Sequence, residues 1–514
     1  MPPPNCRLRL LGRHVELRRL ETWAQANETF WTYKVFGDPY RLDGNDNNIP
    51  CEVLPGNPRR VVPVAANAPV PRNGTIRSRG QTWNCSWCPR SAAFRARVWH
   101  AAPSSGAAVA RVREGALVAE VRSPRAAMET PFEALGRLAP LVREQIAESE
   151  ARRSLSPGVA QAMVDAGLLR LLTPSSLGGM EIDPVGLYKV IEAAARIDGS
   201  FGWCLMILGA TPPLGRGMPE HEARLLLGDP ATVVAGCAFP FGRASVVEGG
   251  YRVSGRWPFA SGCQHATHLM GFCIVHDGDA PRMGPAGPDV RLMTAPAADV
   301  AIVENWEVVG LQGTGSHDIV FDDVFVPEGR AIPLRAGKQN RYYEGALYRV
   351  PFLALFAWPV AAVALGIAQH SIDSALELAQ QKVPAGMVPG TLNARTVFQL
   401  QLADAVAAVR SARAWLHESL DELMALAEAG DMIGLEPRIN AQLAASNATR
   451  SARAAVELMY LAGGGSSVRL NNELQRCMRD MHAVSQHVVT GPATWEQAGV
   501  VLAGLPPINP MITL

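Results

Sequence analysis

The sequence predicts a mainly α-helical protein with a central β domain and a C-terminal four-helix bundle. Apolar residues recur three and four positions apart over 128–230 and again after Ala346, which is the period of an amphipathic helix. Between these regions, 231–335 contains short runs of Val, Ile and Phe separated by Gly and Asp. Such runs are typical of strands joined by tight turns, and favour a compact β-barrel over a parallel sheet with crossover helices. We therefore expect domains at 128–230, 231–335 and 345–514.

The first 127 residues differ in composition from the rest of the chain. They carry 19 Lys plus Arg and 9 Asp plus Glu, a net charge of +10, whereas the remainder carries 29 and 38, a net charge of −9. Pro and Gly interrupt this segment, and its apolar residues keep neither a helical nor a strand period. We expect 1–127 to be a dispensable extension, either disordered or upstream sequence read from a wrongly assigned start codon, with Met128 as the true start.

Two alternatives fit this extension less well. A transit peptide is poor in acidic residues, yet Glu16, Glu21 and Glu28 lie near the start. A closed zinc site needs four ligands, and Cys85 and Cys88 form a single pair. The nine cysteines of the chain lack the dense spacing of a disulfide scaffold, so we expect reduced thiols, a cytoplasmic location and no metal site.

Charge and hydropathy indicate neither a nucleic acid nor a membrane as partner. The whole chain has a net charge of +1, whereas both partners normally require a concentrated basic surface. The most apolar stretch, PFLALFAWPVAAVALGIA from Pro351, is interrupted by Pro359. We expect it to be a buried helix of the bundle.

The helical regions contain recognisable helix ends. A helix is expected from Pro131, and Ser156 and Pro157 are typical of an N-cap and a first helical residue. Gly167 is expected to adopt positive φ where that helix ends, and a further helix is expected from Pro184. The bundle should then consist of helices at 360–381, 394–428, 436–462 and 472–503.

Two segments beside expected strands combine hydroxyl groups with glycine. In WPFASGCQHATH, from Trp257, Ser261 offers a small hydroxyl and Gly262 would let a planar ligand approach closely; a plain turn is the structural alternative. In GLQGTGS, from Gly310, the backbone N–H groups and the hydroxyls of Thr314 and Ser316 could bind the polar edge of a ring. A flexible hairpin is the alternative there.

A third segment, RDMHAVSQH from Arg479, contains His482 and His487. Two metal ligands on one helix face prefer a spacing of three or four residues, so five argues against a metal site. A histidine in such a segment is usually a packed structural residue.

These strings, in this order, resemble the acyl-CoA dehydrogenase superfamily over 128–514. The resemblance is closest to the oxygenase components of two-component (group D) flavin-dependent monooxygenases. In that group the motifs GSxGW, W-x-F-x-SG-x-x-HA, GLRGTGS and RD-x-HA-x-x-x-H are typical, and they correspond here to 199–203, 257–266, 310–316 and 479–487. The resemblance implies an N-terminal helical domain, a middle β-barrel and a C-terminal four-helix bundle.

The resemblance also implies a flavin site and a role for each of its residues. Ser261 would lie near the flavin N5, and Trp203 would wall the cavity. The Gly-rich turn at 461–467 would meet the flavin of a neighbouring subunit, which implies a homotetramer or at least a dimer. The expected cofactor contacts are Trp203, Trp257, Phe259, Ser261, Gly262, Thr314, Ser316 and Gly464.

The expected reaction depends on which residues stand where the dehydrogenases of the superfamily have a catalytic carboxylate. Dehydrogenases of the superfamily remove an α-proton with a Glu, and this chain has His487 at one such place and apolar residues at the other. We therefore expect a monooxygenase with His487 and Ser261 as catalytic residues, acting on an aromatic or polycyclic small molecule with O₂. Reduced FMN or FAD would come from a separate NAD(P)H-dependent flavin reductase. The alternatives are an acyl-CoA dehydrogenase-type flavoprotein that oxidises a CH–CH bond and a non-catalytic flavin-binding protein.

The chain departs from the phenol hydroxylases of this group at three positions. Thr211 stands where a His is usual, Gln312 where an Arg is usual, and His268 where a Trp is usual. These departures weigh against a phenol as substrate. Thr211 and His482 are the candidate substrate contacts.

Overall fold

The computed structural model describes residues 129–284, 287–334, 340–386 and 389–508, together with the backbone of four short strands near the N-terminus. The chain divides into two units, 1–120 and 121–514. In the first unit, two antiparallel hairpins are formed by β1 (Arg7–Leu10) with β2 (Arg13–Glu16) and by β3 (Thr75–Ser78) with β4 (Gln81–Asn84). The expectations of disorder in 1–127 and of a start at Met128 otherwise lie outside the described residues, as do Cys85 and Cys88.

The second unit begins with a group of helices whose ends follow from local capping. Thr130 caps the first of them, since its hydroxyl accepts the Glu133 N–H while the Glu133 carboxylate accepts the Thr130 N–H. The predicted N-cap Ser156 and the positive φ of Gly167 are confirmed. The helices are α2 (Pro131–Glu144), α3 (Ile146–Arg152), α4 (Pro157–Asp165), α5 (Pro184–Ile197), α6 (Gly199–Gly209) and α7 (Glu220–Leu227), and the 3₁₀ helix η4 (Pro212–Gly217) precedes α7.

Helix α6 is the element of this group that carries a predicted site residue, Trp203. It is buried on almost every side, as its uniformly apolar sequence requires. The Asp198 carboxylate caps it by accepting the Phe201 N–H at 2.9 Å. A Cβ on Gly202 would lie 2.5 Å from Ala195 on α5, so glycine is what permits the close approach of the two helices that places Trp203.

The β domain is a mixed sheet in which β5 and β7 are parallel and the other described pairs are antiparallel. Its hydrogen-bonded order is β12-β13-β6-β5-β7-β11-β14, with β8 (Ala280–Pro281) beside β7. This path is open among the described strands, because the three-residue strands β12 and β14 form its two edges and do not pair. The bounds are β5 (Val234–Val247), β6 (Gly250–Ala260), β7 (His268–Asp277), β11 (Val290–Pro296), β12 (Ala301–Val303), β13 (His317–Pro327) and β14 (Ala331–Pro333); β9 (Met283–Gly284) pairs with β10 (Gly287–Pro288).

The C-terminal region is a bundle of long helices: α9 (Val360–Gln381), α10 (Thr396–Ala429), α11 (Leu435–Gly463) and α12 (Glu473–Val484), followed by α13 (Pro492–Leu502). The predicted helix at 472–503 is thus wrong as a single element. Proline lacks an N–H and starts helices readily, so Pro492 begins a new helix instead of continuing α12. His487 lies in the break.

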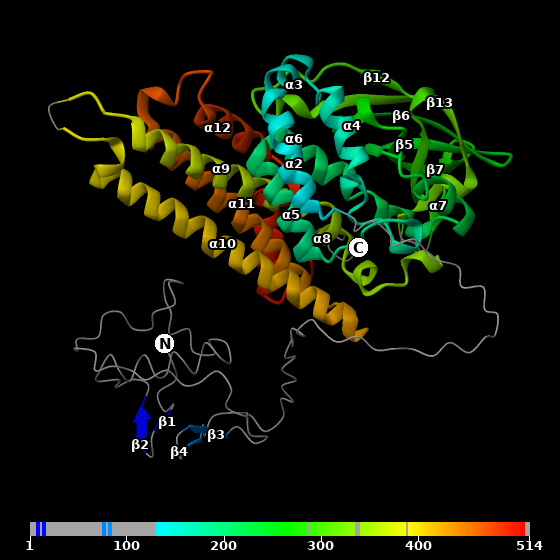
Figure 1. The fold of residues 1–514 in the computed structure, drawn as a ribbon. Coiled ribbons are helices and arrows are strands. Elements are labelled where there is room, and N and C mark those ends of the chain that lie inside the picture. The colour runs from blue at the N-terminus through cyan, green and yellow to red at the C-terminus, as the bar shows by residue number, and fades with distance from the viewer. Residues whose placement is uncertain are drawn as a thin grey trace, which may run out of the picture. The chain divides into compact units, whose positions relative to one another are not determined.

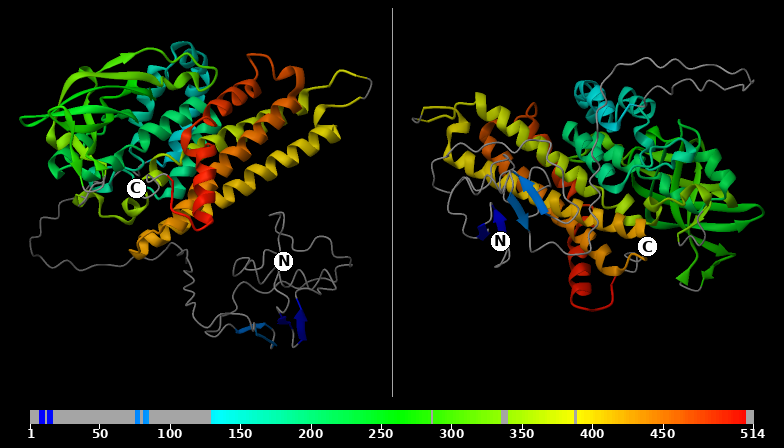
Figure 2. Two further views of the ribbon diagram at one scale, coloured as in Figure 1. Left: turned by 180° about the vertical axis from the view of Figure 1, so that it is seen from behind. Right: turned by 60° about the horizontal axis from the view of Figure 1, so that its bottom comes forward.

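Along the chain, the second unit consists of the N-terminal helices, then the sheet, then the bundle. In space, the N-terminal helices lie between the bundle and the sheet (Figures 1 and 2). Helix α9 joins the bundle to the N-terminal helices, because it packs on α11 and α12 of the bundle and on α5. The segment Phe352–Gln381, which contains α8 (Phe352–Phe356) and α9, is long and apolar enough to span a membrane, but 89% of its most apolar window is buried in the protein. It is a core helix of the bundle. This architecture confirms the predicted fold class of a mainly helical protein with a central β domain and a C-terminal helical bundle. The β domain is an open mixed sheet among the described strands, and not the closed barrel that the sequence predicted.

Candidate active site

Four predicted residues form one buried chain of hydrogen bonds. The Trp203 Nε1–H donates to Ser261 Oγ at 2.9 Å, and Ser261 Oγ lies 2.7 Å from Ser316 Oγ. Ser316 Oγ lies 2.7 Å from Thr314 Oγ1, which donates to the Leu311 carbonyl at 2.9 Å. Helix α6, the end of strand β6 and the glycine-rich loop at 310–316 therefore meet in this hydroxyl cluster.

The direction of this chain follows from its two ends. Indole nitrogen is only a donor and a carbonyl is only an acceptor, while each hydroxyl has a single proton. Since Thr314 donates to the Leu311 carbonyl, Ser316 donates to Thr314 and Ser261 donates to Ser316. Ser261 thus keeps a free acceptor lone pair and has no free proton.

The backbone around the cluster is unusual. Phe259 and Leu311 have positive φ, at 62° and 52°, which bulky residues rarely adopt. The Gly262 N–H donates to the Thr314 carbonyl at 2.9 Å and ties the end of β6 to the loop. Gly262 was expected to leave room for a ligand; instead, a Cβ there would lie 2.9 Å from the Leu208 side chain. The glycine is needed for packing against α6 and for its own φ of 73°.

A buried carboxylate on α12 holds the glycine-rich loop. Asp480 accepts the Leu311 N–H at 2.6 Å, and Arg479 donates to the Val309 carbonyl at 2.8 Å. A Cβ on Gly310 would lie 2.0 Å from the Arg479 carbonyl oxygen, so only glycine fits there. Burial and the neighbouring Asp198 raise the pKa of Asp480 to about 7.

In the sequence, Asp480 stands out only as part of a motif, and its role in holding the loop was not predicted. The available signal was an acidic residue on the apolar face of a helix, between Cys477 and Val484, both of which are buried. A carboxylate in that position normally has a specific partner.

His487 lies beside the hydroxyl cluster, in the break between α12 and α13. Its ring centroid is 5.7 Å from that of Trp203, in an edge-on arrangement. His487 Nδ1 accepts the Val489 N–H at 3.4 Å, so the proton of the neutral ring is assigned to Nε2. Burial lowers the pKa of His487 to about 4. The side chain is therefore a neutral N–H donor at neutral pH.

Exposed aromatic side chains lie at the same end of the sheet. Phe259 is 64% exposed and contacts the Trp306 ring edge-on at 6.1 Å. Phe239 and Phe241, with rings 4.9 Å apart, lie where β5 leaves its register with β7. The antiparallel pairing of β5 with β6 ends at Arg243 and Ser254, so the residues of β5 before Arg243 extend in the direction of the Phe259 end of β6. Phe239, Phe241 and Trp306 were not predicted as site residues, although the string FPF was a visible signal for the first two.

Trp257 was expected to contact the cofactor, and the structure corrects this. The residue is fully buried, and its Nε1–H donates to the Phe272 carbonyl at 3.3 Å. A Cβ on Gly242, Gly255 or Gly271 would lie 2.4 to 2.6 Å from the indole ring. Glycines from three strands therefore enclose Trp257, which is a core residue of the sheet.

Three further predicted residues make no hydrogen bond or ring contact with the cluster in the described part of the chain. The Thr211 hydroxyl is buried and donates to the Leu208 carbonyl at 3.0 Å. His482 Nε2 lies 3.6 Å from Glu457 Oε1 on α11. Gly464, with a φ of 55°, follows α11 at the far end of the bundle. Within 129–508, the described residues also contain no group of three or more His, Cys, Asp or Glu side chains placed to hold a metal ion.

Fold and site together define the class of acyl-CoA dehydrogenase-like flavoproteins. The family model described as "Acyl-CoA dehydrogenase, C-terminal domain" matches residues 359–492. The solved structure of a 3-HSA hydroxylase from Rhodococcus sp. RHA1 has the same fold, with a TM-score of 0.68 and 27% identity, and the match covers 74% of this chain and 98% of that one.

Two sequence relatives narrow the class. The indole-3-acetate monooxygenase of Pseudomonas putida is 33% identical over 71% of this chain and 92% of its own length. The oxygenase subunit HsaA of a flavin-dependent monooxygenase from Rhodococcus jostii is 28% identical over 74% of this chain and 99% of its own length. The chain therefore belongs to the flavin-dependent monooxygenases of the acyl-CoA dehydrogenase superfamily. The predicted family and enzyme class are confirmed.

The residues at the end of β6 fit a flavin. A flavin ring has apolar faces and a polar edge, and the exposed ring of Phe259 stands two residues before Ser261, in a hydroxyl cluster with a spare acceptor. The acceptor on Ser261 matches an N–H group of the ligand. In a flavin, N5 carries a hydrogen in the reduced form and is an acceptor in the oxidised form, so this arrangement suits the reduced form.

Proposed function

We propose that the chain hydroxylates an aromatic small molecule with O₂ and a reduced flavin that a separate NAD(P)H-dependent flavin reductase supplies. When bound, the reduced flavin activates O₂ for transfer of one oxygen atom to the substrate. The observation that carries the proposal is the one-way hydrogen-bond chain from Trp203 to the Leu311 carbonyl, which leaves Ser261 as an acceptor. Two relatives support the rest: one is an indole-3-acetate monooxygenase and another is the oxygenase component of a FADH₂-dependent resorcinol hydroxylase.

His487 is the proposed acid/base or orienting residue. It is neutral because burial lowers its pKa to about 4, and its Nε2–H can donate to a developing negative charge without leaving a cation in an apolar place. The nearby carboxylate, Asp480, is already bound to the Leu311 N–H. An α-proton of an acyl thioester would thus meet no free carboxylate base here, which favours oxygenation over dehydrogenation.

The test compares the affinities for reduced and oxidised flavin. Protein is titrated anaerobically with FMN and with FAD in both redox states, and O₂ is then admitted with an aromatic substrate such as indole-3-acetate. We expect tighter binding of the reduced form, and hydroxylated product. Equal affinity for both states without any product would overturn the proposal, and the titration also decides between FMN and FAD.

Ser316→Ala sharpens this test, because Ser261 loses the acceptor for its proton. The Ser261 hydroxyl can then either donate a hydrogen bond to the flavin or accept one from it. The preference for reduced over oxidised flavin should then fall by about 2- to 13-fold, the worth of one ordinary hydrogen bond. Ser411→Ala is the matched control, since this exposed hydroxyl donates only to backbone carbonyls on α10. An unchanged preference in Ser316→Ala would refute the assigned direction of the chain.

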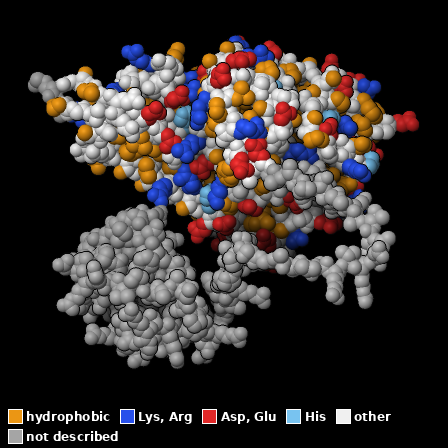
Figure 3. Space-filling model, in the orientation of Figure 1, with side chains coloured by type: hydrophobic (Ala, Val, Ile, Leu, Met, Phe, Trp, Pro, Cys, Tyr) orange, Lys and Arg blue, Asp and Glu red, His pale blue; other side chains and the backbone are white. Residues whose placement is uncertain are grey.

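We also propose a homotetramer, or at least a homodimer, located in the cytoplasm. Exposed apolar side chains gather at the end of the bundle where α9 and α11 end and α10 and α12 begin, namely Val383, Val397, Leu400, Leu461, Val468 and Leu470. This end, at the left of Figure 3, has few charged side chains on the visible face, and such patches mark interaction surfaces. Light scattering on Leu470→Asp, 86% exposed in the single chain, should show smaller particles than for the unmodified chain.

A further inference from the structure

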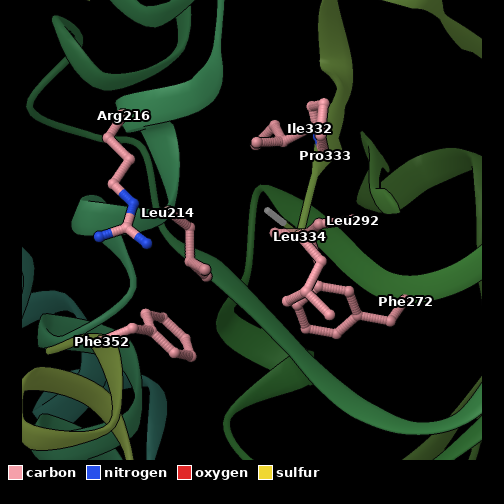
Figure 4. A pocket seen from close by; sticks show the side chains of 8 residues that line it. All are labelled: Leu214, Arg216, Phe272, Leu292, Ile332, Pro333, Leu334 and Phe352. Atoms are coloured by element: carbon pink, nitrogen blue, oxygen red, sulfur yellow. The ribbon is translucent and has the colours of Figure 1, made fainter. Parts of the chain in front are cut away.

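The hollow between η4, β14 and α8 has room only for water (Figure 4). Its volume is about 30 Å³, and one water molecule needs about 10 to 15 Å³ measured in the same way. Arg216 extends along this hollow towards Phe352 (Figure 4), and it is partly buried. Water in the hollow can hydrate this cation, but no larger ligand fits beside it.

A second hollow, between α4, α6 and the start of β5, is large enough for a small molecule. Its volume is about 230 Å³, whereas an apolar cavity of about 150 Å³ already holds a benzene molecule. Pro157 and Gln161, which line it, are exposed, so the hollow opens at the surface beside α4. It can therefore admit an aromatic ring with a substituent.

The wall of this second hollow is apolar and uncharged. Most of its side chains belong to the hydrophobic core or pack against it, namely Leu155, Met163, Val164, Leu169, Leu208 and Val233. Among the described residues, its polar side chains are Gln161 and His265. Burial lowers the pKa of His265, so the imidazole is neutral at neutral pH. A charged ligand would lose its hydration here without gaining an ionic partner, whereas an apolar ring would gain burial and contacts with the Met163 thioether.

Two residues of the wall connect the second hollow to the glycine-rich loop and the hydroxyl cluster. Leu208 packs against Gly262, where a Cβ would lie 2.9 Å from the Leu208 side chain. His265 Nε2 lies 2.9 Å from Ser154 Oγ. A Cβ on Gly315, in the loop, would lie 3.1 Å from the same Ser154 oxygen. A ligand that restrains Leu208 and His265 would thus also restrain the loop.

We propose that the second hollow binds a small neutral aromatic molecule and that the bound molecule stabilises the glycine-rich loop. The site is separate from the hydroxyl cluster, because none of its wall residues belongs to that cluster. A ligand that fits the wall only when Leu208 and His265 are in place favours the ordered state of the loop, and shifts its population accordingly.

Calorimetry in a sealed cell with toluene tests the site, and benzoate is the charged analogue of similar size. The full chain is titrated without flavin, so the result does not depend on the proposed monooxygenase function. We expect toluene to bind and benzoate to bind at least about tenfold more weakly, because benzoate must give up the hydration of its carboxylate. Hydrogen exchange of the amides from Leu311 to His317 should slow when toluene is added.

Three variants locate the bound ring and the connection to the loop. Ala160→Phe should weaken toluene binding at least about tenfold, because Ala160 lines the hollow and the added ring would occupy its space. Ala407→Phe is the matched control, since this exposed alanine on α10 lies outside the hollow, and it should bind toluene as the unmodified chain does. His265→Phe should still bind toluene, but toluene should slow the amide exchange of the loop less, because the contact with Ser154 is lost.

Four results would each overturn the proposal. They are no binding at millimolar toluene, equal affinity for toluene and benzoate, an unchanged toluene affinity in Ala160→Phe, and amide exchange from Leu311 to His317 that is the same with and without toluene.

Discussion

Replacing Asp480 with Ala should release the glycine-rich loop from α12. The Leu311 N–H donates to Asp480 at 2.6 Å, and Leu311 is 4% exposed, so water cannot readily replace the lost carboxylate. A buried donor left without a partner costs about 1 to 3 kcal/mol. Leu311 also holds a positive φ of 52°, which costs further free energy and persists only while its surroundings enforce it. The loop should therefore leave its ordered conformation more often.

The free energy that the loop loses in Asp480→Ala should also weaken flavin binding. The loop carries Thr314 and Ser316, which orient the Ser261 hydroxyl. If only the ordered loop binds the cofactor, affinity falls in proportion to the population of that state. A cost of about 1 to 3 kcal/mol raises the dissociation constant by up to about 5- to 150-fold, the full amount applying where the loop of the unmodified chain is only marginally ordered.

Asp480→Asn is the matched control, because the amide oxygen still accepts the Leu311 N–H while the charge beside Asp198 is removed. We expect it to bind reduced flavin more tightly than Asp480→Ala. The assays are anaerobic flavin titration and hydrogen exchange of the amides from Leu311 to His317. If Asp480→Ala kept both its affinity within twofold and its amide protection, the carboxylate would not be holding the loop.

Three further predictions concern His487 and the N-terminal extension. His487→Ala should lower hydroxylation by about 10² to 10⁴, the usual worth of one positioned acid or base, with flavin affinity nearly unchanged; joint loss of flavin, stability and activity would instead identify a packing residue. The folded-state pKa of His487, about 4, lies below its ordinary value of 6.5, so the stability that the neutral ring contributes is present above pH 6.5 and is lost as the pH falls towards 4. Melting temperatures of the unmodified chain should therefore drop more steeply over this window than those of His487→Gln, and parallel curves would refute the shift. A chain of residues 128–514 should be soluble and bind flavin as the full chain does; insolubility or loss of binding would show that 1–127 is needed.

The ends of the helices could be predicted because they depend on neighbours in the sequence. Ser156 caps α4 through the Val159 N–H, three residues away, and Gly167 takes the positive φ that follows the helix. The last helix of the bundle was misread because its apolar period continues past Val484, whereas Pro492 starts a separate helix. That break is what places His487 beside Trp203.

The sequence by itself determined the fold class, the family and the hydroxyl residues of the site, because these depend on periodicity, helix caps and short motifs. Only the tertiary structure decided which of the predicted site residues are exposed and which are buried. Trp257 and Phe259 are two apart and would share one face of a regular strand, yet the positive φ of Phe259 turns its ring outward while Trp257 stays buried between glycines of three strands. The hydrogen bond from Trp203 to Ser261 and the one from Leu311 to Asp480 likewise connect residues from different elements. These contacts exist only once α6, α12, β6 and the glycine-rich loop have packed together.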